Sequence, residues 1–139
     1  MPVKHLAVEP VVAEPDTPAT RIAERLRDEG VGSVIVEEMG RPVGVVTDRD
    51  LAMAIADQRD VSGLEARDVM TEDPVTIEGD AEAVELPKKM AETHVRRVPV
   101  VDDGKLTGVA TLDDVVATAG EELEDVAEVI EAQSPEYSP

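Results

Sequence analysis

The sequence Gly44-Val45-Val46-Thr47-Asp48-Arg49-Asp50 returns 64 residues later as Gly108-Val109-Ala110-Thr111-Leu112-Asp113-Asp114. Each stretch begins with glycine and short aliphatic residues, which is typical of a buried strand. Each then has threonine, two residues and aspartate, a spacing that is typical of the first turn of a helix. Both stretches therefore predict a strand that runs directly into a helix.

The same shift of 64 residues aligns further positions without a gap. The additional identical pairs are Pro10 and Pro74, Val11 and Val75, Asp16 and Asp80, Ala19 and Ala83, Val31 and Val95, Val34 and Val98, and Gly40 and Gly104. A period of this length that occurs only twice indicates paired units and not a solenoid, which needs three or more repeats. We expect one motif over residues 1–60, a second over 61–120, and an acidic C-terminal segment over 121–139.

Apolar periodicity and turn residues predict a β-α-β-β-α order in each copy. In the first copy we expect strands at 11–12, 33–36 and 43–46, a helix that starts at Asp16-Thr17-Pro18 with a capping side chain and ends at Gly30, and a helix over 51–56. In the second copy we expect strands at 75–77, 98–101 and 106–110, a helix over 81–93 that bends or breaks at Pro87, and a helix that ends near Gly120. The predicted fold class is α+β, with two tandem pseudo-symmetric βαββα motifs packed as one module.

Beyond Gly120, a short acidic helix is predicted with an apolar face of Leu123, Val126, Ala127 and Ile130. This helix could pack on the module, exchange onto a partner chain or dock a client protein. Residues 134–139 are expected to be disordered.

The charge of the chain excludes several kinds of partner. It has 32 acidic and 13 basic residues, a formal net charge of −19, spread over its whole length. Because this field repels phosphodiester backbones and anionic membranes, we expect no nucleic-acid or membrane partner. Dispersed acidity favours a halophilic source, although an ordinary acidic protein with a counterion atmosphere would look similar.

Cysteine is absent and no apolar run approaches the length of a membrane span, so we expect a cytoplasmic protein without redox chemistry. The two histidines, His5 and His94, have no ligand or base at a suitable spacing, so we expect no metal site, no catalytic residues and no enzyme activity. Pairs of acidic residues that could resemble cation sites are Asp48 and Asp50, Asp102 and Asp103, and Asp113 and Asp114. Such acids are more often helix caps or solvated faces.

The repeated threonine and aspartate could carry binding chemistry. An aspartate such as Asp50 can accept hydrogen bonds from two neighbouring ribose hydroxyls, and a threonine hydroxyl with helix amides can serve a phosphate. The alternative is a capping box without a ligand. Two copies in the same register favour the ligand.

The ordered motifs resemble the CBS-domain pair, or Bateman module. The matching stretches are Asp68-Val69-Met70-Thr71, Pro74-Val75-Thr76, Arg96-Arg97-Val98-Pro99-Val100-Val101-Asp102 and Gly108 to Asp114. The resemblance covers nearly the whole chain up to Gly120. It implies two clefts between the motifs that take adenosyl ligands such as AMP, ADP, ATP or S-adenosylmethionine, as effectors and not as required cofactors.

The resemblance also assigns residues to the two clefts. It implies a first cleft with Thr47 and Asp50 for ribose and phosphate, Val45 and Val75 around adenine, and Arg96 and Arg97 for phosphate. It implies a second cleft with Thr111, Asp114, Val109 and Val11, with Gly32 and Ser33 where the arginines should be. We therefore expect a phosphorylated adenine nucleotide in the first cleft and a weaker ligand, or none, in the second. The alternative for the arginines is a surface ion pair.

The favoured interpretation is a stand-alone regulatory module that senses a ligand and acts on a separate, unknown client. By resemblance, it would form a homodimer through the apolar faces of the helices at 51–56 and 115–119. Two alternatives remain: a ligand-free scaffold for dimerisation or protein interaction, and a cation-binding or catalytic protein that uses the acidic pairs.

Overall fold

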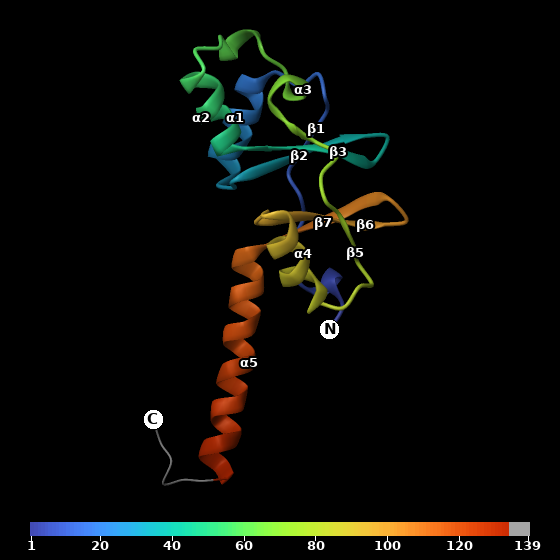
Figure 1. Ribbon diagram of the computed structural model, residues 1–139, viewed down its shortest axis with the longest axis vertical. Coiled ribbons are helices and arrows are strands. Elements are labelled where there is room, and N and C mark those ends of the chain that lie inside the picture. The colour runs from blue at the N-terminus through green and yellow to red at the C-terminus, as the bar shows by residue number, and fades with distance from the viewer. Residues whose placement is uncertain (134–139) are drawn as a thin grey trace.

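Two small α+β units and one long C-terminal helix make up the computed structural model, which describes residues 1–133 (Figure 1). The elements in chain order are η1 (Val3–His5), β1 (Val12–Ala13), α1 (Ala19–Glu29), β2 (Ser33–Glu38), β3 (Arg41–Thr47), α2 (Asp48–Ala56), η2 (Val61–Gly63), α3 (Ala66–Val69), β4 (Thr71–Glu72), β5 (Ile77–Glu78), α4 (Glu85–Thr93), β6 (Arg97–Asp102), β7 (Lys105–Thr111) and α5 (Leu112–Gln133). The predicted α+β class with two βαββα motifs is confirmed.

Each unit is built on one sheet. The first sheet has the order β1-β2-β3-β4 and the second the order β5-β6-β7. In both, an antiparallel hairpin, β2-β3 or β6-β7, is joined by a short parallel strand that precedes the helix of its copy. Figure 1 shows the two hairpins stacked face to face, and the Leu106 amide donates to the Gly40 carbonyl at 2.8 Å where their turns meet.

Two aliphatic cores lie on the outer sides of the sheets, and each takes in a segment of the other copy. Val3 and Leu6 are buried in the core of the second sheet, and the Val3 amide donates to the Ala81 carbonyl at 2.8 Å. Ala66 is buried in the core of the first sheet, where Leu64 and Val69 also pack. The packing units therefore differ from the sequence copies: residues 1–8 pack with the second copy, and 61–72 with the first.

Helix α1 follows the sequence prediction except at its start. Ile22 and Leu26 are buried on one face, and Gly30 ends the helix with a φ of 64° that suits a residue without a Cβ. The expected side-chain cap is wrong, because Thr17 Oγ1 accepts from the Glu14 amide at 3.0 Å and does not cap the helix. The Leu64 carbonyl accepts from the first helical amide instead, so tertiary packing replaces the local cap.

Helix α4 is shorter than expected. It begins at Glu85 and not at residue 81, which makes Pro87 the third residue of the helix. A proline is tolerated there because an amide in the first turn has no acceptor within the helix, whereas an upstream turn would clash with the proline ring. His94 ends the helix with a φ of 56°, at the position that Gly30 occupies in the first copy.

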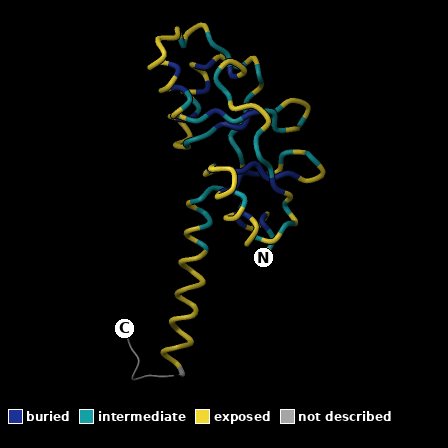
Figure 2. The backbone as a smooth tube through the Cα atoms, in the orientation of Figure 1, coloured by how far each residue is buried: buried dark blue, intermediate teal, exposed yellow. Residues whose placement is uncertain are grey.

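The two helices expected on either side of Gly120 are one continuous helix, α5. A single interior glycine costs only about 1 kcal/mol relative to alanine, too little to break a helix of this length. Its first turns pack on the second unit, and the rest extends away from the body with exposed side chains (Figure 2). Within residues 1–133, no helix has both the length and the apolar content that a membrane crossing requires. The segment 134–139, for which we expected disorder, lies outside the described residues.

Candidate functional site

A cavity of about 440 Å³, here called the Asp50 cleft, opens where β3 meets α2. Its lining residues are Val45, Thr47, Asp48, Arg49, Asp50, Thr71, Asp73, Pro74, Val75, Thr93, His94, Val95, Arg96 and Arg97. The structure thus brings together all six residues that the family resemblance assigned to this cleft. They come from both copies, and this arrangement places the cavity between the two sheets.

Thr47 and Asp50 form a capping box at the start of α2. The Thr47 amide donates to Asp50 Oδ2 at 2.8 Å, and the Asp50 amide donates to Thr47 Oγ1 at 3.1 Å. Within residues 1–133, the other carboxylate oxygen, Oδ1, has no protein donor. The capping box therefore fixes the carboxylate and leaves one oxygen able to accept a hydrogen bond from a ligand.

A second cavity of about 360 Å³, here called the Asp114 cleft, lies beside the start of α5. Its lining residues are Val8, Glu9, Val11, Val31, Gly32, Ser33, Arg96, Arg97, Val109, Thr111, Leu112 and Asp113. Five of the six expected residues, Thr111, Val109, Val11, Gly32 and Ser33, are among them. Asp114 is absent from this lining of described residues, and its neighbours Leu112 and Asp113 occupy that side.

The Thr-Asp pair of the second copy has one hydrogen bond more than that of the first. Asp114 Oδ2 accepts from the Thr111 hydroxyl at 2.9 Å and from the Thr111 amide at 3.3 Å. Because the hydroxyl donates within this pair, its proton is already engaged. In the first copy, no such bond from the Thr47 hydroxyl to Asp50 is formed among the described residues.

Arg96 and Arg97 line both clefts, so the expectation that the Asp114 cleft lacks cationic donors is wrong. Arg97 is the first residue of β6, and its guanidinium lies over Gly32, where a Cβ would meet Nη2 and lie 3.2 Å from Cζ. The absence of a side chain at Gly32 lets the long arginine of the other copy reach across. Gly32 therefore leaves room in the Asp114 cleft for the guanidinium of Arg97, which the sequence analysis had assigned only to the first cleft.

The arginine pair is free of carboxylate partners within residues 1–133, because none of the ion pairs there includes Arg96 or Arg97. The described residues therefore do not form the surface ion pair that was the alternative role for these arginines. Formal charges in the Asp50 cleft balance, with Asp48, Asp50 and Asp73 against Arg49, Arg96 and Arg97. In a chain of net charge −19, this balance makes the cleft less repulsive to an anion than the rest of the surface.

The described residues hold no group of three or more His, Cys, Asp or Glu side chains arranged to bind a metal ion. His94 is exposed and lines the Asp50 cleft, a position that the sequence did not assign to any site. Val31 and Val95 were also missed, although each lines one cleft. Their equivalence in the repeat was the available signal, since equivalent residues of a pseudo-symmetric pair occupy equivalent cavities.

The structure therefore consists of two tandem copies of one α+β motif, with two clefts that are lined by residues of both copies. The family model described as "CBS domain" matches residues 3–57 and 66–121, and the chain belongs to the CBS domain family. An uncharacterised protein of Methanopyrus kandleri is 38% identical over 128 residues, which cover 85% of this chain and 65% of that protein. The chain thus spans less than two thirds of the length of this relative.

Two solved structures show the same fold with ligands. A CBS domain pair in complex with 5′-methylthioadenosine and S-adenosyl-L-methionine has a TM-score of 0.80 and 25% identity, covering 88% of this chain and 98% of that chain. A CBS domain protein from Pyrobaculum aerophilum complexed with AMP has a TM-score of 0.76 and 27% identity, covering 82% of this chain and 89% of that chain.

Proposed function

We propose that this chain is a regulatory module that binds an adenine nucleotide (AMP, ADP or ATP), or a related adenosyl compound such as S-adenosylmethionine, between its two CBS motifs. The similar solved structures carry AMP, 5′-methylthioadenosine and S-adenosyl-L-methionine, which supports the adenosyl class. The cleft volume of about 440 Å³ also lies in the range of small-molecule sites.

One observation carries the proposal: two arginines without carboxylate partners among the described residues face a cleft that also holds the Thr47–Asp50 pair. A guanidinium presents its donors in a fork that matches phosphate oxygens. The free oxygen of Asp50 would accept from a ribose hydroxyl, and Val45 and Val75 would contact adenine. Such a site combines an apolar surface for adenine, a carboxylate oxygen that accepts from a ribose hydroxyl, and guanidinium groups that donate to phosphate oxygens.

We propose the Asp50 cleft as the stronger of the two sites. Of the two cavities it is the larger, and Asp50 is among its lining residues, whereas Asp114 is not among the described residues that line the Asp114 cleft. The Thr111 hydroxyl is also engaged by Asp114. Arg96 and Arg97 would serve a phosphate in either cleft, so the difference between the clefts depends on the Thr-Asp pairs and not on the arginines.

Ligand occupancy would change how the two units sit against each other, and a separate client protein would read that change. Dimerisation through the motif helices would extend the module. Met53 and Ile55 on α2 are 45% and 64% exposed, and Val116 on α5 is 62% exposed, which supports an apolar interface there.

The competing function is a ligand-free scaffold for protein interaction, which the exposed apolar face of α5 favours. A thermal-shift series with AMP, ATP, S-adenosylmethionine and GMP separates the two. A ligand that binds only the folded chain raises its melting temperature, and the rise grows with the logarithm of the ligand concentration above the dissociation constant. We expect a rise with at least one adenosyl compound and none with GMP. If no adenosyl compound shifts the melting temperature at saturating concentration, the scaffold is the better description.

A further inference from the structure

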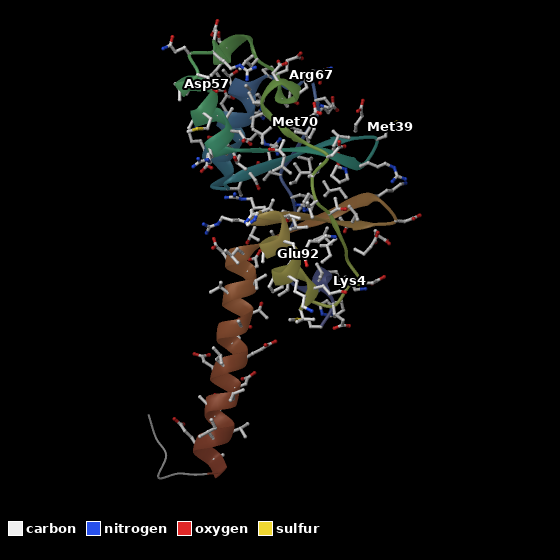
Figure 3. All side chains as sticks on the ribbon, viewed as in Figure 1. Lys4, Met39, Asp57, Arg67, Met70 and Glu92 are labelled. Atoms are coloured by element: carbon white, nitrogen blue, oxygen red, sulfur yellow. The ribbon has the colours of Figure 1, made fainter. Side chains whose placement is uncertain are left out.

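Helix α5 continues well past the body of the molecule and carries an apolar face that nothing in the described residues covers. Leu123, Val126, Val129 and Ile130 are 70%, 54%, 62% and 41% exposed. Figure 3 shows their part of α5 standing free of the two units. A helix with large exposed aliphatic residues on one face indicates an interaction surface.

The spacing of this face is that of a coiled coil. Val116, Ala119, Leu123, Val126 and Ile130 follow one another at intervals of three, four, three and four residues. This alternation places them at the a and d positions of a heptad, which form the seam between two helices. We call these five residues the α5 seam.

The acidic residues of α5 avoid the positions that flank the seam. The helix holds eight acidic and no basic residues. If the seam residues are at a and d, the e and g positions from Gly120 to Val129 are Gly120, Glu122, Ala127 and Val129, and only Glu122 is charged. The other acids of this part, from Glu121 to Glu131, lie at b, c and f, on the outer side.

This charge pattern decides between the possible occupants. A basic partner helix would be recognised through acids at e and g, where flanking charges of the two helices meet. Here those positions are mostly small or apolar, so a second equally acidic helix can approach with little direct repulsion at the seam. We propose that α5 pairs with α5 of a second copy of this chain along the α5 seam.

Two features of α5 limit the strength of the pairing, its outward charges and the short length of the seam. The outward carboxylates still repel at long range, and this repulsion is screened over about 10 Å at 0.1 M salt but about 3 Å at molar salt. The seam covers only two heptads, so it forms a concentration-dependent contact that adds to any contact between the bodies. The proposal concerns assembly only and is independent of any ligand.

Sedimentation velocity of the full chain in molar KCl, over a range of protein concentrations, tests the pairing. We expect a dimer whose dissociation constant rises at least roughly tenfold in Leu123→Glu, because a charge then replaces an apolar seam residue. Ala132→Glu is the matched control, since it adds the same charge at a c position on the same helix. A wild-type monomer, or a dimer that both variants weaken equally or not at all, overturns the proposal.

Cysteine cross-linking keeps the proposal testable if Leu123→Glu impairs folding. The natural chain has no cysteine, so each introduced thiol is unique. Oxidation with diamide should join Val126→Cys chains, or Leu123→Cys chains if the helices are antiparallel, at least roughly tenfold faster than Glu128→Cys chains. Equal rates at the seam and at Glu128, on the outer face, contradict the pairing.

Discussion

The guanidinium of Arg97 lies over the backbone of Gly32, so close that a Cβ at position 32 would meet Nη2. The two residues belong to different copies of the repeat, and both line the Asp114 cleft, while Arg97 also lines the Asp50 cleft. One arginine is therefore within reach of both proposed ligand sites.

The first prediction follows from this contact. Gly32→Ala should displace the Arg97 side chain from the Asp114 cleft, because a flexible side-chain end moves more readily than backbone. We expect AMP to bind the weaker site roughly tenfold less tightly or not at all, with affinity at the Asp50 cleft retained. Two-site calorimetry with AMP and adenosine measures this, since only the phosphorylated ligand should respond.

Gly63→Ala is the matched control, because a Cβ at Gly63 meets no atom within 4 Å. It should leave both sites unchanged. Equal loss for AMP and adenosine in Gly32→Ala would mean that the substitution blocks the cleft itself and that Arg97 does not act on the phosphate.

A second prediction compares equivalent glycines of the two copies. A Cβ at Gly108 would lie 2.9 Å from Ala7 Cβ and 3.2 Å from the Val8 carbonyl oxygen, so the N-terminal segment would have to move. The three atoms nearest to a Cβ at Gly44 all belong to the side chain of Met70, which has three rotatable bonds. Urea unfolding should show that Gly108→Ala lowers the free energy of unfolding by about 1–3 kcal/mol and by more than Gly44→Ala. Equal losses would show that the packing of residues 1–8 on the second sheet is not rigid.

The repeat made most of the fold predictable. The motif ending at Asp50 and its copy ending at Asp114 located a strand and a helix start in each half, and both halves then followed the same periodicity. The errors were at positions where distant parts of the chain decide local structure. The start of α1 is capped by the carbonyl of Leu64, and no local pattern near Thr17 contains that information.

The residues of the Asp50 cleft could be named because the ordered motifs resemble the CBS-domain pair, a resemblance that implies clefts built from both copies. The arginine content of the Asp114 cleft could not be predicted, because residue-by-residue equivalence matched Gly32 and Ser33 to the arginine positions. A long side chain can occupy the space that a glycine leaves in the partner motif. Which side chain does so depends on tertiary geometry and not on spacing within either copy.

A third prediction concerns salt. With a net charge of −19 and acids along the whole chain, self-repulsion should destabilise the folded state at low ionic strength. We expect the melting temperature to rise by roughly 4 °C or more between low and molar KCl. Chloride is preferable to sulfate, which strengthens apolar burial by itself. A melting temperature indifferent to KCl would contradict both the repulsion and a halophilic source.

The most direct test of a nucleotide site between the CBS motifs is calorimetric titration of AMP into the wild-type chain, Asp50→Ala and Asp114→Ala. Both variants remove the N3 carboxylate of a capping box and lose a hydrogen bond worth about 1 kcal/mol, so a stability loss affects them alike and each is a control for the other. We predict that Asp50→Ala weakens the tighter AMP site at least roughly 30-fold, whereas Asp114→Ala changes it less than about threefold. If Asp114→Ala abolishes AMP binding while Asp50→Ala retains it, the assignment of the stronger site to the Asp50 cleft is wrong.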